Sequence, residues 1–476
     1  MTATWIAFLL YVVVAIGLGL RSQRRSITST DFWTAGRQLD GISVGLSISA
    51  GFMSVSWSCV YAVQLFYWYG LGALWLITIP WLLALVGIYI LARRYHHLSA
   101  FSQPEMVGQR FGPQARRTVA LALAFVFLVW GGAEIYVAAT LLAPGMGISA
   151  KLMILIISLV VGIYATMGGF RAVVATDKLQ YAIVALYILA MGWLATRGLG
   201  LIEGGWPAPS TTGTKSDLGW AHLLSPSVVT IIVTFAAYLP GWLFETDLWI
   251  RVQAARDDRN ARRGVALAGV NAFLFVGLLP LFIGVTALAL FPLENGHYPA
   301  AVGYEGDAIF VALVANFAPG WLAVLVSVGL VAAAMSTVDT CANVMALSVA
   351  YDMLEVHRRR GGWRWSRLAT AGAVTAAYIF ALNTESLWDI FYLSSGVLTT
   401  AVAFPVAAVF LRRVNPKGVR WSSMSGLVGI ILTYFLEAHG PLAGWEPDWL
   451  AASGLGFIIW GILAAAAGYG LGHLIK

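Results

Sequence analysis

The chain has few charged residues and few of the side chains that support metal or redox chemistry. Charged residues make up 11% of its 476 positions, whereas a soluble domain carries about a quarter. Its two cysteines, Cys59 and Cys341, both lie in apolar runs, which excludes a disulfide framework and gives no sign of a metal site. We also find no nucleophile–base pair, no phosphate-binding loop and no cluster of metal ligands, and we therefore predict that the protein is not an enzyme.

Hydrophobic sequence is what the chain has in abundance. Hydrophobic residues make up 59% of it, and the mean hydropathy is +0.80. Runs long enough to cross a bilayer recur along its whole length. Hydropathy predicts an all-α membrane protein with about 13 spans, at 4–20, 41–68, 71–92, 118–143, 150–168, 178–197, 227–250, 264–291, 318–354, 367–383, 387–411, 423–438 and 449–474.

The basic residues alternate between the two sides of the predicted membrane. All but three of the 29 lysines and arginines fall on one side, the exceptions being Lys151, Arg197 and Lys215. Such asymmetry marks the basic side as cytoplasmic. We therefore expect a multi-pass protein of the cell membrane with its N-terminus outside and its C-terminus inside. The net charge of +7 is then a topology signal, and we expect the lipid bilayer but no nucleic acid as a partner.

Two adjacent hydroxyls, Ser336 and Thr337, and a carboxylate, Asp339, interrupt the apolar segment 321–354. Polar groups at membrane depth are costly unless another part of the protein binds them. Because hydroxyl and carbonyl oxygens are hard ligands, they suit a small cation, and we hypothesise a sodium site. The alternative is ordinary helix packing, with each hydroxyl bonded to its own backbone.

Two of the predicted spans contain helix breakers. Serines and glycines begin the span 41–68, where we predict unwinding around residues 50–54, and Pro240-Gly241 lies within the span 227–250. Each interrupted helix begins a run of five spans, and because five is odd, the two runs have opposite orientations. Inverted repeats of this kind are a transporter plan with the ligand at the midplane. The predicted division is 1–40 for the first helix and a linker, 41–197 and 227–411 for the repeats, 198–226 for an extracellular loop and 412–476 for two C-terminal helices.

Three acids in or beside the spans are candidate functional groups. Glu134 lies in an apolar span near Trp130, and an intramembrane acid is either functional or makes a structural hydrogen bond from its protonated form. Asp177 opens a span, so it either lines an inner ion path or complements the helix dipole. Glu245 follows Pro240-Gly241 in a segment crowded with aromatic residues.

Short motifs spread along the chain resemble the sodium/solute symporter family, which includes sodium–glucose, sodium–proline and sodium–sialic acid cotransporters. The motifs are Asp31-Phe32-Trp33-Thr34-Ala35-Gly36-Arg37, Gln103-Pro104-Glu105 with Gln109-Arg110-Phe111-Gly112, Gly168-Gly169-Phe170-Arg171-Ala172-Val173 with Thr176-Asp177 and Gln180, Arg251-Val252-Gln253-Ala254-Ala255-Arg256, and Ala334-Met335-Ser336-Thr337 with Asn343 and Asp352. The resemblance implies a LeuT-like five-plus-five inverted repeat and a sodium ion held between the broken second helix and the ninth. It assigns carbonyl ligands to Ala50, Met53 and Ala333 and hydroxyl ligands to Ser336 and Thr337, and it places Asp177 near the inner ion route or at a second sodium site.

The chain departs from the family at positions that bear on the solute. Phe52 stands where proline-type members carry an Asp, Glu134 stands where many members carry a Gln, and we see no lysine or arginine within the membrane to bind a carboxylate. We therefore expect an amine or another cationic or zwitterionic solute, bound by charge pairing and cation–π contacts. The candidate solute-binding residues are Trp57, Trp130, Glu134, Tyr238, Trp242 and Glu245.

The sequence thus predicts a sodium-coupled symporter that imports a small organic solute by alternating access, and we expect it to function as a monomer. One alternative is a proton-coupled transporter of the same fold that uses Glu134 or Asp177. A membrane-embedded enzyme and a sensor that binds without transport are further alternatives, and we expect no appended soluble domain of the kind a sensor would carry.

Overall fold

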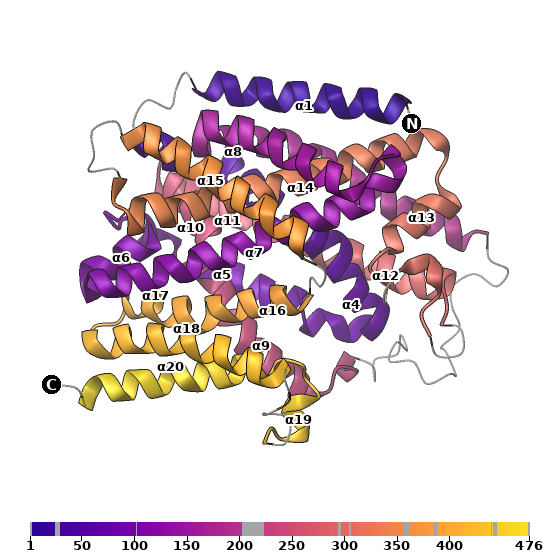
Figure 1. Ribbon diagram of the computed structural model, residues 1–476. Helices are drawn as coiled ribbons and strands as arrows, with labels where there is room; N and C mark the ends of the chain where they lie inside the picture. Colours follow the sequence, from indigo (N-terminus) through magenta and orange to yellow (C-terminus); the bar gives the residue numbers. More distant parts are fainter. Residues whose placement is uncertain are drawn as a thin grey trace.

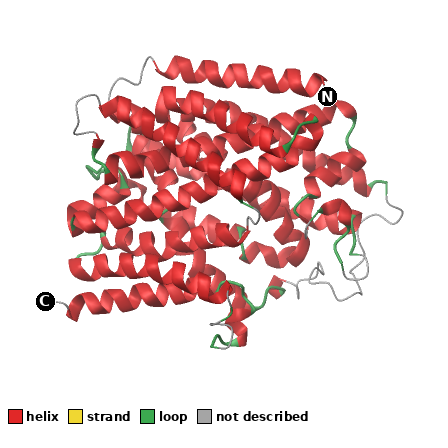
Figure 2. Ribbon diagram, viewed as in Figure 1, coloured by secondary structure: helices red, strands yellow, loops and turns green. Residues whose placement is uncertain are grey.

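The computed structural model describes residues 2–23, 29–100, 102–201, 223–293, 297–303, 306–356, 362–384, 388–438, 440 and 445–474. Regular structure in these ranges is helical, with no strand (Figure 2). The predicted extracellular loop 198–226 lies mostly outside the described residues. The helices are α1 (Thr2–Gln23), α2 (Ser29–Thr34), α3 (Gly41–Phe52), α4 (Ala62–Tyr69), α5 (Thr78–His96), α6 (Gln103–Phe111), α7 (Pro113–Met146), α8 (Ala150–Leu199), α9 (Val228–Leu243), α10 (Thr246–Ala254), α11 (Asp258–Ala272), α12 (Leu279–Leu290), α13 (Ile309–Phe317), α14 (Gly320–Ala346), α15 (Gly362–Asn383), α16 (Trp388–Val397), α17 (Phe404–Ala408), α18 (Pro416–Ala438), α19 (Asp448–Ala451) and α20 (Gly456–Leu474).

The long helices run nearly alongside one another (Figure 1). In the described part, eight are long and apolar enough to cross a membrane, and one bent pair makes a ninth. All 13 predicted spans are mainly helical, but α8 alone contains two of them, and the number of crossings stays a prediction. The two ends of the chain lie at opposite ends of the helices (Figure 1), which is the arrangement that an odd number of crossings gives.

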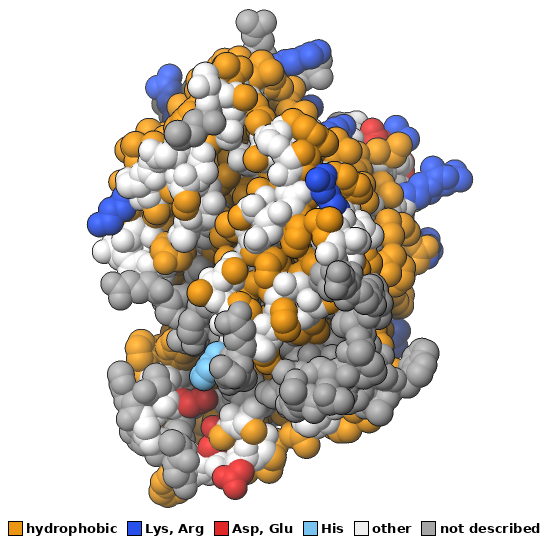
Figure 3. Space-filling view, turned by 90° about the vertical axis from the view of Figure 1, so that its right-hand side faces the viewer, with side chains coloured by type: hydrophobic (Ala, Val, Ile, Leu, Met, Phe, Trp, Pro, Cys, Tyr) orange, Lys and Arg blue, Asp and Glu red, His pale blue; other side chains and the backbone are white. Residues whose placement is uncertain are grey.

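The centre of the molecule is formed by α7, α8 and α14, which pack against one another. At one edge α1 packs on α8, and at the opposite edge α18 packs on α20 (Figure 1). Figure 3 views the molecule along the helices, from the end at the right of Figure 1, and hydrophobic and uncharged polar side chains both reach the surface there. Hydrophobic side chains also reach the outside along the helices, as on α1, where Ile6, Leu10 and Val13 are 62%, 65% and 66% exposed. A surface of this kind is expected of a protein that lies in lipid.

The long helix α8 turns sharply at Gly169. The backbone of Gly169 has φ +58° and ψ −154°, a conformation open to glycine and strained for other residues. A Cβ atom at this position would lie 2.6 Å from the carbonyl oxygen of Phe32, so the turn also needs the absence of a side chain. One glycine therefore separates two predicted spans, 150–168 and 178–197.

The first predicted helix break is confirmed. Asp40 begins α3 by accepting the N–H of Ser43 at 2.7 Å, and this hydrogen bond lowers the pKa of Asp40. The helix ends at Phe52, and a π-helical segment, Val55–Tyr61, starts after Ser54 in a direction bent by 62°. The unwound residues thus fall within the predicted range.

The second break lies later than predicted. Pro240 stays inside α9, and the chain leaves helical geometry only at Phe244 and Glu245, which separate α9 from α10. A proline removes one backbone hydrogen bond, and a helix can bend around that loss. The hydroxyl of Thr399 also donates to the carbonyl oxygen of Ala237 at 2.5 Å, which supplies a local partner for the backbone beside the proline.

Candidate functional site

The first helix break brings backbone carbonyls to the hydroxyl pair of α14. Ser336 Oγ lies 3.0 Å from the carbonyl oxygen of Ala50 and 2.8 Å from that of Ala333. Thr337 Oγ1 lies 3.2 Å from the carbonyl oxygen of Gly51 and 3.3 Å from that of Ala333. The structure therefore joins four of the five residues predicted for the sodium site and adds Gly51, which the sequence reading did not select.

These oxygens form a compact and uncharged cluster. Ala50, Ala333 and Ser336 have no exposed surface, and Thr337 is half-buried. The fifth predicted residue, Met53, is buried at the break itself, where it ends α3. The hydroxyls donate to the carbonyls, and each keeps lone pairs that can turn toward a cation. Because every ligand is a neutral hard oxygen, the cluster suits a small monovalent cation that has to be released again.

Glu134 on α7 binds the start of the second half of the broken helix. Its Oε1 accepts the N–H of Val55 at 2.6 Å, and its Oε2 accepts the N–H of Ser56 at 3.0 Å and the hydroxyl of Ser56 at 2.5 Å. Glu134 is fully buried, and the N-terminus of a helix favours a negative charge. It therefore acts as a helix cap supplied by another helix. Its oxygens accept these hydrogen bonds, whereas the structural alternative predicted from the sequence was a hydrogen bond donated by a protonated Glu134.

Replacing Glu134 by alanine is expected to lower the stability of the protein. The change leaves the buried N–H of Val55 without its acceptor, at about 1–3 kcal/mol, and also removes the acceptor of the partly buried N–H of Ser56. Thermal unfolding of the purified protein in detergent measures the loss. Glu134→Gln is the matched control, because it keeps one acceptor oxygen and should unfold between the two. An alanine variant that unfolds with the parent protein would contradict the capping role.

A small cavity with four tryptophans lies between the two helix breaks. Its volume is about 60 Å³, and its lining residues are Gly51, Phe52, Ser54, Ser56, Trp57, Trp81, Trp130, Trp242, Glu245 and Thr337. The ring centroids of Trp57 and Trp242 are 5.2 Å apart, and Trp81 lies 6.3 Å from the first and 5.6 Å from the second. Pockets for organic ligands usually measure about 300–1,000 Å³, so a solute can enter only if these rings move apart.

Four of the six predicted solute-binding residues line this cavity, namely Trp57, Trp130, Trp242 and Glu245. The other two lie behind it. Tyr238 stacks on Trp242 with ring centroids 5.2 Å apart and planes 9° apart, and Glu134 faces the backbone of the broken helix. Thr337 lines the cavity as well as the oxygen cluster. The two sites therefore share a wall.

The second break is bound by a helix from the segment 93–117, which lies between two of the predicted spans. Gln103, the first residue of α6, donates from Nε2 to the carbonyl oxygen of Phe244 at 3.0 Å and accepts the hydroxyl of Thr246 through Oε1. Both ends of the interruption thus have a partner. Glu245, the residue between them, is buried and reaches the cavity.

Arg251 on α10 corrects the expectation that no basic side chain lies within the membrane region. Its side chain has no exposed surface, and all of its donor groups are engaged. Nε donates to the hydroxyl of Ser47 at 2.8 Å, and Nη1 donates to the carbonyl of Asp247 at 3.1 Å and its carboxylate at 3.4 Å. Nη2 donates to the hydroxyl of Thr340 at 2.8 Å and to the carboxylate of Asp177 at 3.3 Å.

The predicted ion-path residue Asp177 belongs to this buried cluster. Asp177 is fully buried, accepts the hydroxyl of Ser47 and pairs with Arg251. Asp339, also fully buried, accepts the hydroxyl of Tyr164 at 2.7 Å. Among the described residues, no lysine or arginine nitrogen lies within 4.0 Å of the Asp339 carboxylate. The cluster therefore surrounds one guanidinium with more than one carboxyl group.

Comparisons with known proteins agree with this geometry. The sodium:solute symporter family matches residues 32–426. The chain is 25% identical to sodium/glucose cotransporter 4 of Mus musculus over 91% of this chain and 68% of that protein. It is also 25% identical to the uncharacterized symporter YwcA of Bacillus subtilis (strain 168) over 93% of this chain and 87% of that protein.

A solved structure shows the same fold. The chain is similar to a Na+-coupled sialic acid symporter in a substrate-bound outward-open state, with a TM-score of 0.72 and 17% sequence identity over 100% of this chain and 98% of that chain. The predicted LeuT-like five-plus-five fold is thereby confirmed. Because the family match spans most of the chain, the protein belongs to the sodium:solute symporter family, and it is a sodium-coupled membrane transporter rather than an enzyme.

Proposed function

We propose that the protein imports a small organic solute together with sodium, and that the oxygen cluster at the first helix break binds the ion. The ligands are the carbonyl oxygens of Ala50, Met53 and Ala333 and the hydroxyls of Ser336 and Thr337. The observation that carries this proposal is the approach of both hydroxyls to carbonyls that the broken helix has freed. Lys and Arg gather on one side of the predicted spans, so we place that side, with the C-terminus, in the cytoplasm.

Coupling follows from the wall that the two sites share. An ion at the oxygen cluster fixes Thr337 and the end of α3, and both contribute to the solute cavity. If sodium binding stabilises the arrangement of Thr337 and the end of α3 that the solute requires, sodium raises the affinity for the solute. The solute then raises the affinity for sodium by the same factor. The membrane potential adds about 2.3 kcal/mol per charge per 100 mV.

The cavity favours an amine or another cationic or zwitterionic solute. Trp57 and Trp242 meet edge to face, and tryptophan faces attract cations. Glu245 supplies a carboxylate at the same cavity. Glu134 contributes to this proposal as a positioning residue, because its oxygens bind the backbone that carries Ser56 and Trp57.

Arg251 and Asp177 form a barrier between the ion cluster and the basic side. A Cβ atom on Gly51 would lie 3.6 Å from Arg251 Nη2, which places the guanidinium next to the break. The chain that follows Arg251 leads directly into the basic segment 256–263. The ion pair must therefore rearrange before sodium can leave toward that side.

Uptake into proteoliposomes tests this function. A sodium gradient is expected to drive accumulation of a radiolabelled amine or zwitterion, and potassium or choline gradients are not. Candidate solutes come from a thermal-shift screen of amines, amino acids and sugars with sodium against potassium, in which a true solute stabilises the protein more with sodium. Uptake that persists without sodium and follows pH would overturn the proposal in favour of proton coupling through Glu134 or Asp177.

A further inference from the structure

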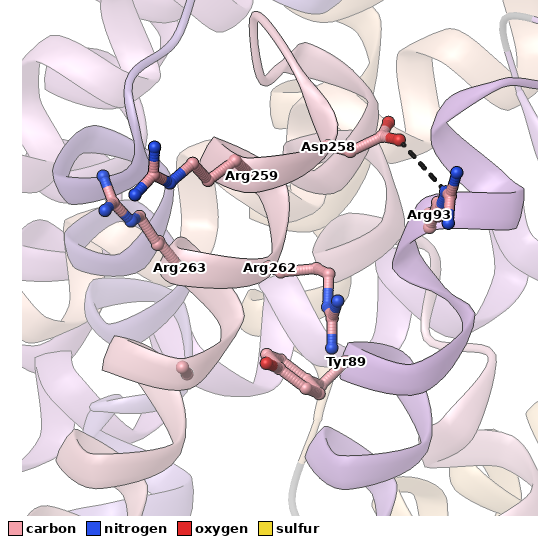
Figure 4. A pocket seen from close by; sticks show the side chains of 7 residues that line it. Tyr89, Arg93, Asp258, Arg259, Arg262 and Arg263 are labelled. Atoms are coloured by element: carbon pink, nitrogen blue, oxygen red, sulfur yellow. Dashed lines mark ion pairs between the residues drawn. The ribbon is translucent and has the colours of Figure 1, made fainter.

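A basic cavity of about 410 Å³ lies between α5 and α11, away from the transport site. It is lined by Tyr89, Arg93, Asp258, Arg259, Arg262, Arg263 and Ala266 (Figure 4). In Figure 4, Arg259 and Arg263 extend together to one side of α11, and Arg262 extends to the other side, where it reaches Tyr89 on α5. The guanidinium of Arg262 lies 4.3 Å from the centre of the Tyr89 ring.

The positive charge of this cavity is not neutralised by the protein. Among the described residues that line it, the one acid is Asp258. Asp258 is already engaged, by Arg93 at 3.6 Å and by His96 and His97 at 3.0 and 2.9 Å. No carboxylate of the described part lies within 4.0 Å of the guanidinium groups at 259, 262 and 263. Clustered guanidinium groups without a counterion bind phosphate well, because their paired N–H groups match its oxygens.

The wall that carries these arginines is fixed in place. Asp257 begins α11 by accepting the N–H of Asn260 at 2.8 Å. The side chain of Asn260 in turn accepts the N–H of Gly41 at 2.8 Å, which ties the first turn of α11 to the start of α3. The arginines therefore project from an ordered element, so that a bound anion would meet groups already in position.

Apolar side chains continue from the cavity along both helices. On α5, Val86 and Ile90 lie three residues before Tyr89 and Arg93, and are 52% and 67% exposed. On α11 the row at 259, 262 and 266 continues to Val270, which is 58% exposed, and then to Phe273, which directly follows α11 and is 51% exposed. Residues three or four apart share one face of a helix. A charged cavity that opens onto two exposed apolar rows has the form of a site for a headgroup with acyl chains.

We propose that this cavity binds the phosphate headgroup of an anionic phospholipid, in the leaflet on the basic side of the membrane. Arg259 and Arg263, which extend together, bind the phosphate oxygens, and Arg262, held over Tyr89, adds positive charge to the cavity. The apolar rows that continue from α5 and α11 contact the acyl chains. Basic pockets between membrane helices bind anionic lipids in this way. The inference depends on neither the identity of the solute nor the coupling ion.

Native mass spectrometry of the delipidated full-length protein tests the site, with phosphatidylglycerol, phosphatidylcholine and inorganic phosphate as probes. Phosphatidylglycerol is expected to bind and phosphatidylcholine is not. The variant R259Q/R262Q/R263Q should bind phosphatidylglycerol about a hundredfold more weakly. The control R21Q/R117Q/R412Q removes the same charge from exposed positions outside the cavity and should bind like the parent protein.

Three outcomes would overturn the proposal. If phosphatidylcholine binds as strongly as phosphatidylglycerol, the site does not require a net negative charge on the lipid. Equal loss in both triple variants would reduce the effect to overall charge, and full competition by inorganic phosphate would make the cavity a site for soluble anions. If R259Q/R262Q/R263Q is not recovered folded, R259Q/R263Q serves instead, because it keeps the contact between Arg262 and Tyr89.

Discussion

Replacing Ser336 and Thr337 together by alanine is expected to raise the sodium concentration for half-maximal uptake by about a hundredfold. A hydrogen-bonding group that binds a charge contributes about 1.5–3 kcal/mol, and about 1.4 kcal/mol corresponds to a factor of ten. The loss of two hydroxyl ligands is therefore expected to weaken sodium binding by about two factors of ten. The proposed carbonyl ligands of Ala50, Met53 and Ala333 remain, so sodium should still bind, but weakly. Initial rates of uptake at increasing sodium concentration measure the shift.

The same helix offers a matched control. Ser327 on α14 donates to the carbonyl oxygen of Ala323 at 2.9 Å, as an ordinary helix serine does. Ser327→Ala removes a half-buried hydroxyl nine residues before Ser336 and is expected to leave the sodium requirement unchanged. Unchanged sodium dependence in the double variant would remove Ser336 and Thr337 from the ion site and leave them as packing residues.

The first break and the hydroxyl pair could be predicted because their signals are local. Serine and glycine weaken a membrane helix wherever they gather, and the hydroxyls of Ser336 and Thr337 need partners at membrane depth. The freed carbonyls near residue 50 and the hydroxyls near residue 336 both need partners. The sequence therefore predicts that these two segments meet, although nearly three hundred residues separate them. Gly51 was missed because backbone oxygens look alike in a sequence, and only the direction of the break decides which of them faces α14.

The cavity was harder to predict because its residues lack a local signal. Trp81 stands in an apolar run of α5, and the adjacent Pro80 lies in the first turn of that helix, where a proline causes no break. Tryptophans in membrane proteins usually mark the interfaces. Only the packing of α5 against α9 brings Trp81 to Trp242. The position of the second break was wrong for a related reason: Pro240 is a strong breaker by type, yet the structure places the interruption at Glu245, where Gln103 can bind the open end.

Arg251 shows where a reading by hydropathy fails. The segment that follows Arg251 is basic, so the sequence predicted that Arg251 belongs to the same solvated loop. Hydropathy averages over a window and cannot separate the one arginine that points inward from its neighbours that point outward. The signal that was present is the spacing of Asp247 and Arg251, four residues apart on one helix face, together with Asp177 in a distant span that also needed a partner.

Replacing Arg251 by methionine is expected to cause a large loss of stability, about 3–5 kcal/mol. Methionine keeps most of the volume but leaves the buried carboxylates of Asp177 and Asp247 without their counter-charge, and removing one partner of a buried ion pair is costly for this reason. The yield of monodisperse protein and its thermal unfolding in detergent measure the effect. Arg256→Met, whose side chain is 57% exposed and pairs with Asp257 at 3.5 Å, is the control and should change stability by less than about 1 kcal/mol.

A second change separates lost charge from lost shape. If uncompensated carboxylates cause the damage, Arg251→Met combined with Asp177→Asn should recover part of the stability, because the double variant buries one charge fewer. If lost packing caused it, the asparagine would bring no recovery. An Arg251→Met protein as stable as the parent would instead show that water enters this cluster, and Arg251 would then no longer be a barrier between the proposed sodium site and the basic side. The stability of the Arg251→Met protein thus tests the proposed path by which sodium leaves.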